Sequence, residues 1–294
     1  MKKLLKIGLC FFLIMALFLR IGKKETSVET NKTYRKIISL TLSGDEMLLS
    51  LVEADRIAAL SGRINQDTDV SNVVKQAEMF PKIENNLEKI IELEPDFVIA
   101  ADWMKKELLL QIREMGIPIY VYKTPDSFEE QKKLILDLAS FLGEKKRGEE
   151  ITNNMQKRLE VLQKKISVHP KTEKLRVLLY TSFETTSGEK TTFDDMLKQI
   201  GAVNVASEIG ICGSKQISKE IVIDSNPDII IIPVWKSYNT EEESSEKIFQ
   251  DPGFQTVKAV REKKVYFLPY RQLTPTSQYM IDGMEALAEV IYGT

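Results

Sequence analysis

Residues 87–100 read LEKIIELEPDFVIA, and residues 219–232 read KEIVIDSNPDIIII. The two stretches align without a gap, which pairs Glu88 with Glu220 and places a Pro-Asp dipeptide at the same point of each. Each stretch predicts a short helix, a Pro-Asp turn and a buried strand. The repeat therefore predicts two similar α/β lobes that carry one glutamate at the same position. An accidental match is the alternative, because Pro-Asp before a strand is ordinary turn chemistry.

Composition limits the class of protein. The 294 residues suit two domains, and a hydrophobic fraction of 43% is enough for two cores. The net charge is −2, and residues 1–24 hold basic side chains but no acid, so the remaining body is more acidic still. An acidic body argues against nucleic acid as a partner. The single histidine, His169, excludes a metal site built on clustered imidazoles, as in a zinc or manganese receptor. The two cysteines, Cys10 and Cys212, predict no structural disulfide.

The N-terminus predicts targeting outside the cytoplasm. A basic start precedes an apolar run over residues 7–19, and Arg20 follows it in place of a small-residue cleavage site. Residues 1–24 are therefore either a cleaved signal peptide or a retained N-terminal membrane anchor, and Cys10 lies too early in the run to suit lipid attachment. Residues 25–34 are polar and predict a flexible tether.

Strands and helices alternate through most of the body, which is typical of parallel sheets covered on both faces. Ser43 is the expected N-cap of the first helix, in a capping box with Glu46. The predicted class is α/β, with two Rossmann-like lobes, an N-terminal lobe over 35–142 and a C-terminal lobe over 171–294. The predicted strands cover 36–40, 56–60, 97–101 and 118–122 in the first lobe and 175–180, 229–233 and 265–268 in the second.

Residues 143–170 predict one long helix between the lobes. Its apolar stripe is Ile151, Met155, Leu159, Leu162 and Ile166, at spacings of three and four residues. A helix over 144–166 would extend for roughly 35 Å. We expect a stiff strut between the lobes, with a surface helix on one lobe as the alternative.

Chemical motifs favour a binding protein. No phosphate-binding loop and no histidine-based catalytic triad is present. In α/β sheets ligands bind outside the carboxyl ends of the strands, so the loops after the strands are the expected site. A tryptophan in each lobe, Trp103 and Trp235, predicts either an aromatic clamp on a flat or apolar ligand or two residues that cap their own sheets. The expected ligand-binding residues are Ser43, Arg63, Met79, Trp103, Trp235, Tyr238, Tyr270 and Arg271, with no catalytic and no metal-ligating residue.

Several motifs, taken together and in order, resemble the substrate-binding proteins of bacterial ABC transporters for iron–siderophore complexes, haem and cobalamin. The resemblance covers about residues 35–293. It rests on RKIISLTLSGDEML (35–48), NLEKI (86–90), LEPDFVI (93–99), GIPI (116–119), QISKEIV (216–222), NPDII (226–230) and DGMEALA (282–288). The family fold is two α/β lobes joined by one rigid helix, the class III periplasmic-binding-protein fold.

The resemblance implies a function in uptake rather than catalysis. Glu88 and Glu220 match the family's docking glutamates, which engage arginines of the permease that works with an ATPase subunit. The implied ligand is an iron complex, either a ferric siderophore held by Arg63 and Arg271 or haem ligated by Tyr238, Tyr270 or Met79. Cobalamin is the alternative within the family, and a surface sensor, an extracytoplasmic enzyme and an adhesin are the alternatives outside it. We expect a monomer with no intrinsic cofactor and only a small closure of the lobes.

Overall fold

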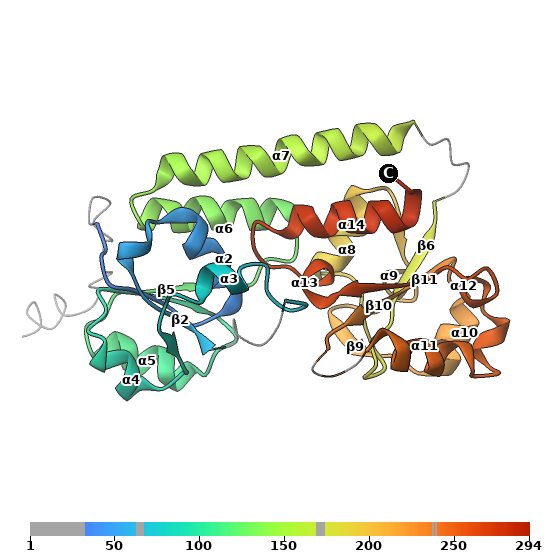
Figure 1. Cartoon of the computed structure of the whole chain (residues 1–294), viewed down its shortest axis with the longest axis horizontal. Coiled ribbons are helices and arrows are strands. Elements are labelled where there is room, and N and C mark those ends of the chain that lie inside the picture. The colour runs from blue at the N-terminus through green and yellow to red at the C-terminus, as the bar shows by residue number, and fades with distance from the viewer. Residues whose placement is uncertain (1–32, 63–67, 169–173, 237, 239) are drawn as a thin grey trace, which may run out of the picture. The chain divides into compact units, whose positions relative to one another are not determined.

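Two parallel β-sheets organise the chain in the computed structural model, which describes residues 33–62, 68–168, 174–236, 238 and 240–294 (Figure 1). The first sheet has the order β3-β2-β1-β4-β5, and all its strands are parallel. Its strands are β1 (Ile37–Ser39), β2 (Ile57–Ser61), β3 (Lys82–Ile83), β4 (Phe97–Ala101) and β5 (Ile119–Tyr122). The helices around it are α2 (Leu42–Leu51), η1 (Ala54–Arg56), α3 (Val74–Ala77), α4 (Leu87–Glu92), α5 (Lys106–Glu114) and α6 (Phe128–Phe141).

The second sheet has the order β11-β10-β6-β8, again parallel, and a separate antiparallel ribbon pairs β7 with β9. The strands are β6 (Arg176–Leu179), β7 (Thr185–Ser187), β8 (Val203–Asn204), β9 (Ser214–Gln216), β10 (Ile229–Val234) and β11 (Val265–Pro269). The helices are α8 (Thr192–Gln199), α9 (Val205–Glu208), α10 (Lys219–Ser225), α11 (Glu241–Phe249), η3 (Phe254–Thr256), α12 (Lys258–Arg261), α13 (Tyr270–Leu273) and α14 (Met280–Tyr292).

Both faces of each sheet are buried, which explains why the central strands are continuous apolar runs. Successive residues of a strand point to opposite faces. In β10, Ile229 and Ile231 join the core beneath α7 (Lys145–Ser167) and α14, whereas Ile230 and Ile232 pack into a separate cluster with α11 and α12. The same alternation in β4 divides its residues between this shared core and a separate cluster of the first lobe.

The internal repeat is a structural repeat. Asn86 and Ser218, which align in the two copies, both cap their helices, accepting bonds from Lys89 N at 3.2 Å and Ile221 N at 3.4 Å. The residue before each Pro-Asp dipeptide adopts the left-handed conformation, with φ of 46° at Glu94 and 42° at Asn226. The chain thus leaves α4 and α10 in the same way and enters β4 and β10 at aligned positions.

The aspartate of each Pro-Asp dipeptide holds the first strand of its lobe. Asp96 accepts bonds from the backbone amides of Arg35 at 2.7 Å and Lys36 at 2.9 Å. Asp228 accepts one from the amide of Arg176 at 2.9 Å. Because a carboxylate satisfies amides just before β1 and at the first residue of β6, the repeated dipeptide holds the start of the first strand in both lobes.

Helix α7 runs along both lobes and contacts α6 of the first and α14 of the second (Figure 1). Met155, Leu159 and Leu162 are buried, and Ile151 and Ile166 pack against the same core, as the apolar stripe predicts. The expectation of a strut is confirmed, and the alternative of a surface helix on one lobe is wrong.

Some expectations were wrong or concern residues that are not described. The N-cap of α2 is Thr41, whose side chain accepts from Gly44 N at 3.1 Å, so the predicted capping box of Ser43 and Glu46 does not form. Glu46 is instead buried, with its carboxylate bonded to Asn72 and Ser277. The predicted signal peptide or anchor, Arg63 and His169 lie outside the described residues. Within the described residues, we find no helix that combines the length and the apolar character needed to cross a membrane.

Candidate functional site

An aromatic pocket of about 240 Å³ lies at the carboxyl ends of β6, β10 and β11. Trp235 follows β10, and Tyr270 follows β11 as the first residue of α13. The chain after β6 supplies Phe183 and the β7–β9 ribbon. This is the position at which open parallel sheets bind ligands, because the loops that follow adjacent strands converge there.

Four aromatic rings of this pocket form a connected series. The ring centroid of Trp235 is 4.2 Å from that of Tyr238 and 5.7 Å from that of Tyr270, and Tyr238 meets Phe183 edge-on at 6.1 Å. Phe183 and Tyr238 are 62% and 61% exposed, which is unusual for side chains of this size. An exposed aromatic series beside a hollow favours a ligand with flat or apolar faces.

The remaining lining of the aromatic pocket is neutral. Leu179, Pro233 and Leu273 are apolar, and the polar lining consists of hydroxyl groups, including a pair at 3.2 Å between Ser187 Oγ and Ser214 Oγ. Among the described residues that line the pocket, none carries a charged side chain. Hydroxyls can donate or accept, so they suit a ligand with several oxygen atoms.

The cationic side chains beside the pocket are tied to the first lobe. Arg271 donates from its guanidinium to the carbonyl of Thr68 and from its backbone to Asp69 O at 2.7 Å. Lys236 Nζ lies 3.8 Å from Asp69 Oδ2. These contacts bring the segment at 68–69 against the loops that border the aromatic pocket.

The structure brings only some of the predicted ligand residues together. Trp235, Tyr238 and Tyr270 share the aromatic pocket, with Arg271 next to it in the chain. Trp103, at 59% exposed, and Met79, at 73%, do not line this pocket. Ser43 is half-buried and its hydroxyl is bonded to that of Thr276, so it joins the two lobes.

Two buried carboxylates lie where α2 meets the second lobe. Glu46 accepts from Asn72 N at 2.9 Å and from the hydroxyl of Ser277, and burial raises its pKa. Asp45 accepts from Ser61 N at 3.1 Å and from the Ser61 hydroxyl, and burial raises its pKa to about 7. Both carboxylates are bonded within the protein: Asp45 holds α2 to the end of β2, and Glu46 holds it to the second lobe.

The two repeated glutamates occupy equivalent positions in their helices. Glu88 and Glu220 are each the second residue of a short helix, and both are exposed. A hydrogen bond from its own backbone and one from the Ser218 hydroxyl lower the pKa of Glu220, so it is ionised at neutral pH. The fold therefore presents one carboxylate per lobe at equivalent positions.

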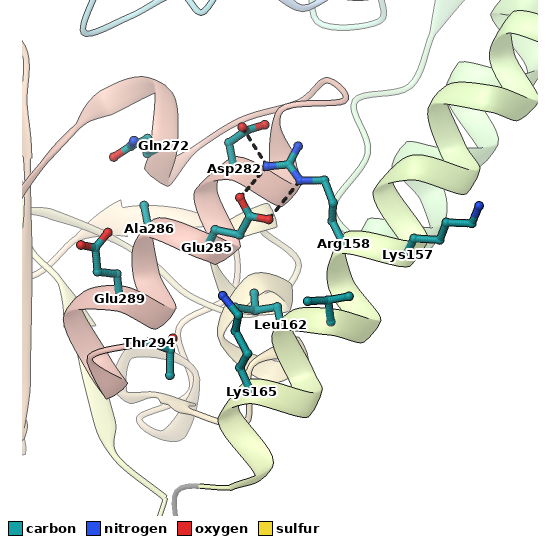
Figure 2. Close-up of a pocket in the computed structure, with 11 residues that line it drawn as sticks. Lys157, Arg158, Leu162, Lys165, Gln272, Asp282, Glu285, Ala286, Glu289 and Thr294 are labelled. Atoms are coloured by element: carbon teal, nitrogen blue, oxygen red, sulfur yellow. Dashed lines mark hydrogen bonds and ion pairs between the residues drawn. The ribbon is translucent and has the colours of Figure 1, made fainter.

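A larger hollow of about 620 Å³ lies between α7 and α14 (Figure 2). Its central charges are already paired, because Arg158 Nε donates to Glu285 at 3.0 Å and Nη2 to Asp282 at 3.0 Å (Figure 2). It is also lined by helices rather than by strand ends. The smaller aromatic pocket is therefore the candidate ligand site, and this hollow is a groove beside the strut.

Residues 37–271 match the family model described as periplasmic binding protein. The chain belongs to this family. This periplasmic binding protein is 27% identical over 271 residues to an uncharacterized ABC transporter substrate-binding lipoprotein, YvrC, of Bacillus subtilis. The match covers 90% of this chain and 82% of YvrC. The chain is also 25% identical over 193 residues to the iron-uptake system-binding protein of Bacillus subtilis, covering 63% of this chain and 58% of that one.

Solved structures show the same fold. A periplasmic binding protein from Veillonella parvula superposes with a TM-score of 0.77 at 24% identity, covering 90% of this chain and 93% of that one. A possible iron-binding solute-binding protein from Staphylococcus epidermidis superposes with a TM-score of 0.75 at 23% identity, covering 89% and 100%. The expected class III periplasmic-binding-protein fold is confirmed.

Family membership gives the broad function. Periplasmic binding proteins of this kind serve ABC transporters and act outside the cytoplasm, and they are not enzymes. They carry a ligand rather than an intrinsic cofactor. No cluster of three or more His, Cys, Asp or Glu side chains within the described residues could hold a metal ion.

Sequence reasoning missed Phe183 and the hydroxyl-rich ribbon. Phe183 lies in a loop that the sequence places after a strand, but nothing in its neighbours distinguishes it from a core residue. Ser187 and Ser214 come together only through the pairing of β7 with β9, across 27 residues of chain. The signal that could have found Phe183 is its place, as an aromatic residue, in the loop after a predicted strand.

Proposed function

We propose that this periplasmic binding protein captures an iron complex, a ferric siderophore or haem, and delivers it to an ABC importer. The observation that carries the proposal is the series of four aromatic rings at the carboxyl ends of β6, β10 and β11. Relatives named for iron uptake and solved neighbours named for haem binding support an iron complex as the cargo.

The neutral aromatic lining favours a ligand with a flat organic frame. Ring faces of Phe183, Trp235, Tyr238 and Tyr270 would stack against it, and the hydroxyls of the ribbon would bond its oxygen atoms. At about 240 Å³ the pocket is below the ~300–1,000 Å³ typical of ligand sites, so it would hold one edge of the complex. The rest of the complex would lie against the first lobe, where Trp103 and Met79 are exposed.

Tyr238 and Tyr270 are the groups that would bind iron directly if the ligand is haem, because a tyrosine oxygen is an established axial ligand. Both are exposed to the pocket, at 61% and 37%. For a ferric siderophore, the same phenols would act as hydrogen-bond donors and Arg271 would supply positive charge at the rim.

Delivery would use Glu88 and Glu220 as docking residues, one on each lobe. Their aligned positions and exposure support this role, and exposed carboxylates suit a transient partner with arginines at matching positions. Complementary charge raises the association rate and fixes the orientation, while leaving the bound ligand untouched.

The test is a titration of the full chain with haem, with ferric siderophores of several chemistries, with cobalamin and with molybdate, read by ligand absorbance and tryptophan quenching. Tyr270→Phe and Tyr238→Phe are compared with Tyr266→Phe, a phenol of β11 that does not line the pocket. We expect binding of haem or a ferric siderophore, weakened about tenfold or more by at least one pocket variant and unchanged in the control. Binding of cobalamin or molybdate alone would contradict the iron assignment.

Uptake by the importer tests the docking residues separately. Glu88→Ala combined with Glu220→Ala should abolish transport through the permease while the ligand titration stays normal. Normal uptake by this double variant would remove the docking role and leave the ligand assignment standing.

A further inference from the structure

The first turns of α4 and α10, which carry the proposed docking glutamates, each contain a lysine beside the glutamate. In α4 the sequence is Glu88-Lys89, and in α10 it is Lys219-Glu220. A lysine next to a carboxylate that has to attract a cationic partner would cancel much of its charge, because like charges at an interface disfavour association. The lysine positions are not equivalent, since Lys219 aligns with Leu87 and Lys89 with Ile221.

Each of these lysines is paired with an acid from outside its helix. Lys89 Nζ lies 3.8 Å from Glu84, with both side chains largely exposed. Lys219 Nζ lies 2.6 Å from Asp251 Oδ2, where the side chains are only 36% and 28% exposed. The second pair is shorter and better shielded, so it holds its lysine more firmly.

The surroundings of Asp251 form a niche for the Lys219 side chain. The other oxygen of Asp251 accepts from Gly253 N at 2.8 Å, which fixes the carboxylate. The Lys219 ammonium lies 5.8 Å from the centre of the Phe254 ring. Gly253 leaves room for the lysine, because a Cβ there would be 2.7 Å from Lys219 Cε and 3.1 Å from Nζ.

We propose that Asp251 is a positioning residue of the docking surface, which turns Lys219 into this niche so that Glu220 meets the permease without Lys219 paired to its carboxylate. The inference rests on the proposed docking role of Glu220. This surface fits a cationic partner on the permease, because Glu220, Lys219 and Asp251 together leave one negative charge. In the first lobe Glu84 has the same role towards Lys89, through a longer and more exposed ion pair.

The experiment measures the affinity of the full chain, without ligand, for its permease–ATPase complex in lipid nanodiscs at low and high salt. Asp251→Asn should weaken docking about two- to fivefold at low salt, the effect of one exposed charge pair. The double variant Lys219→Met with Asp251→Asn should recover the affinity of the parent, because the freed lysine is then gone. Unfolding midpoints of all variants show that each is folded.

A second variant changes no charge. Gly253→Ala keeps Asp251 but pushes the flexible end of Lys219 out of the niche, so it should weaken docking in the same direction. Lys219→Met should again rescue it. The matched control is Glu262→Gln, which frees Lys264 from a similar pair at 2.5 Å elsewhere on the lobe and should leave docking unchanged.

The outcomes separate the two proposals. If Glu220→Gln does not weaken docking, the docking role itself fails. If Glu220→Gln weakens it but Asp251→Asn and Gly253→Ala do not, the positioning role of Asp251 is overturned and docking stands. Weak docking that Lys219→Met does not rescue would also overturn it, because Asp251 would then act through something other than the lysine.

Discussion

Asp45 and Glu46 are adjacent in sequence, and both carboxylates are buried in the N-terminal half of α2. Asp45 bonds Ser61 at the end of β2, whereas Glu46 bonds Ser277 of the second lobe. A buried carboxylate is disfavoured in its charged form unless hydrogen bonds compensate, and here desolvation is the larger effect on both. These two residues therefore make the contact between α2 and its surroundings sensitive to pH.

The free energy of unfolding should depend on pH through Asp45. Burial raises its pKa to about 7 from 3.8, so the folded state binds a proton that the unfolded chain has released between these values. The contribution of Asp45 to the free energy of unfolding is therefore fully present below pH 3.8, and it is lost as the pH rises through about 7. Each pH unit between the unfolded and folded pKa values corresponds to about 1.4 kcal/mol. Urea unfolding of the full chain and of Asp45→Asn at several pH values measures this loss.

The variant cannot ionise at this position, so its stability relative to the parent should increase from about pH 4 to about pH 7, between the unfolded and the folded pKa values of Asp45. Glu46 titrates in both proteins, so the difference between them reports Asp45 together with its electrostatic coupling to Glu46. A difference that is constant over this range would show that Asp45 is not protonated in the folded protein at acidic pH.

Residue identities alone do not reveal these partners. Ser43 and Glu46 have the spacing of a capping box, yet Thr41 caps the helix and Glu46 reaches a serine 231 residues away. The local pattern was equally compatible with both arrangements. What decides between them is the packing of α2 against the second lobe, which no local signal reports.

At the scale of elements, the sequence predicted the parts that have strong periodicity. The strands Phe97–Ala101 and Ile229–Val234 and the helix Lys145–Ser167 were expected within one or two residues, because apolar runs and a sustained stripe indicate them directly. The β7–β9 ribbon was missed, because its strands have three residues each and the residues of β9 are all exposed. The position of the candidate pocket at the carboxyl ends of the strands followed from the predicted topology. The part of its wall that the β7–β9 ribbon forms could not be predicted in this way.

The contact between α6 and α7 depends on Gly148. A Cβ at this position would lie 2.5 Å from the Cβ of Ala139, so the two helices approach closely only without it. Alanine is favoured over glycine in a helix by about 1 kcal/mol, but overpacking a tight contact costs about 1–3 kcal/mol. We expect the packing cost to win, so that Gly148→Ala lowers the free energy of unfolding.

The matched double variant combines Gly148→Ala with Ala139→Gly, which moves the methyl group to the other helix. It should recover most of the loss, because the space between the helices is then the same. Both are measured by urea unfolding. A Gly148→Ala protein more stable than the parent would show that α6 and α7 separate at no cost.

At the scale of the whole molecule, side-chain contacts join the lobes at several points besides α7. Glu46 bonds Ser277, Gln278 Nε2 donates to the Glu46 carbonyl at 2.8 Å, and the Arg271 guanidinium donates to Thr68. Arg158 of α7 is held by two acids of α14 (Figure 2). A helix that packs on both lobes resists bending, since a sharp bend would have to break its backbone hydrogen bonds.

Ligand binding should therefore change the relative orientation of the lobes very little. We expect small-angle scattering profiles of the full chain with and without haem, or with and without whichever ferric siderophore binds, to superimpose within error. Arg158→Met removes the ion pairs between α7 and α14 while keeping a long side chain, so any ligand-dependent change should be larger in this variant. A marked contraction of the parent on binding would mean that the strut bends, and the carboxylates of Glu88 and Glu220, which we propose for docking, would then change their separation when the ligand binds.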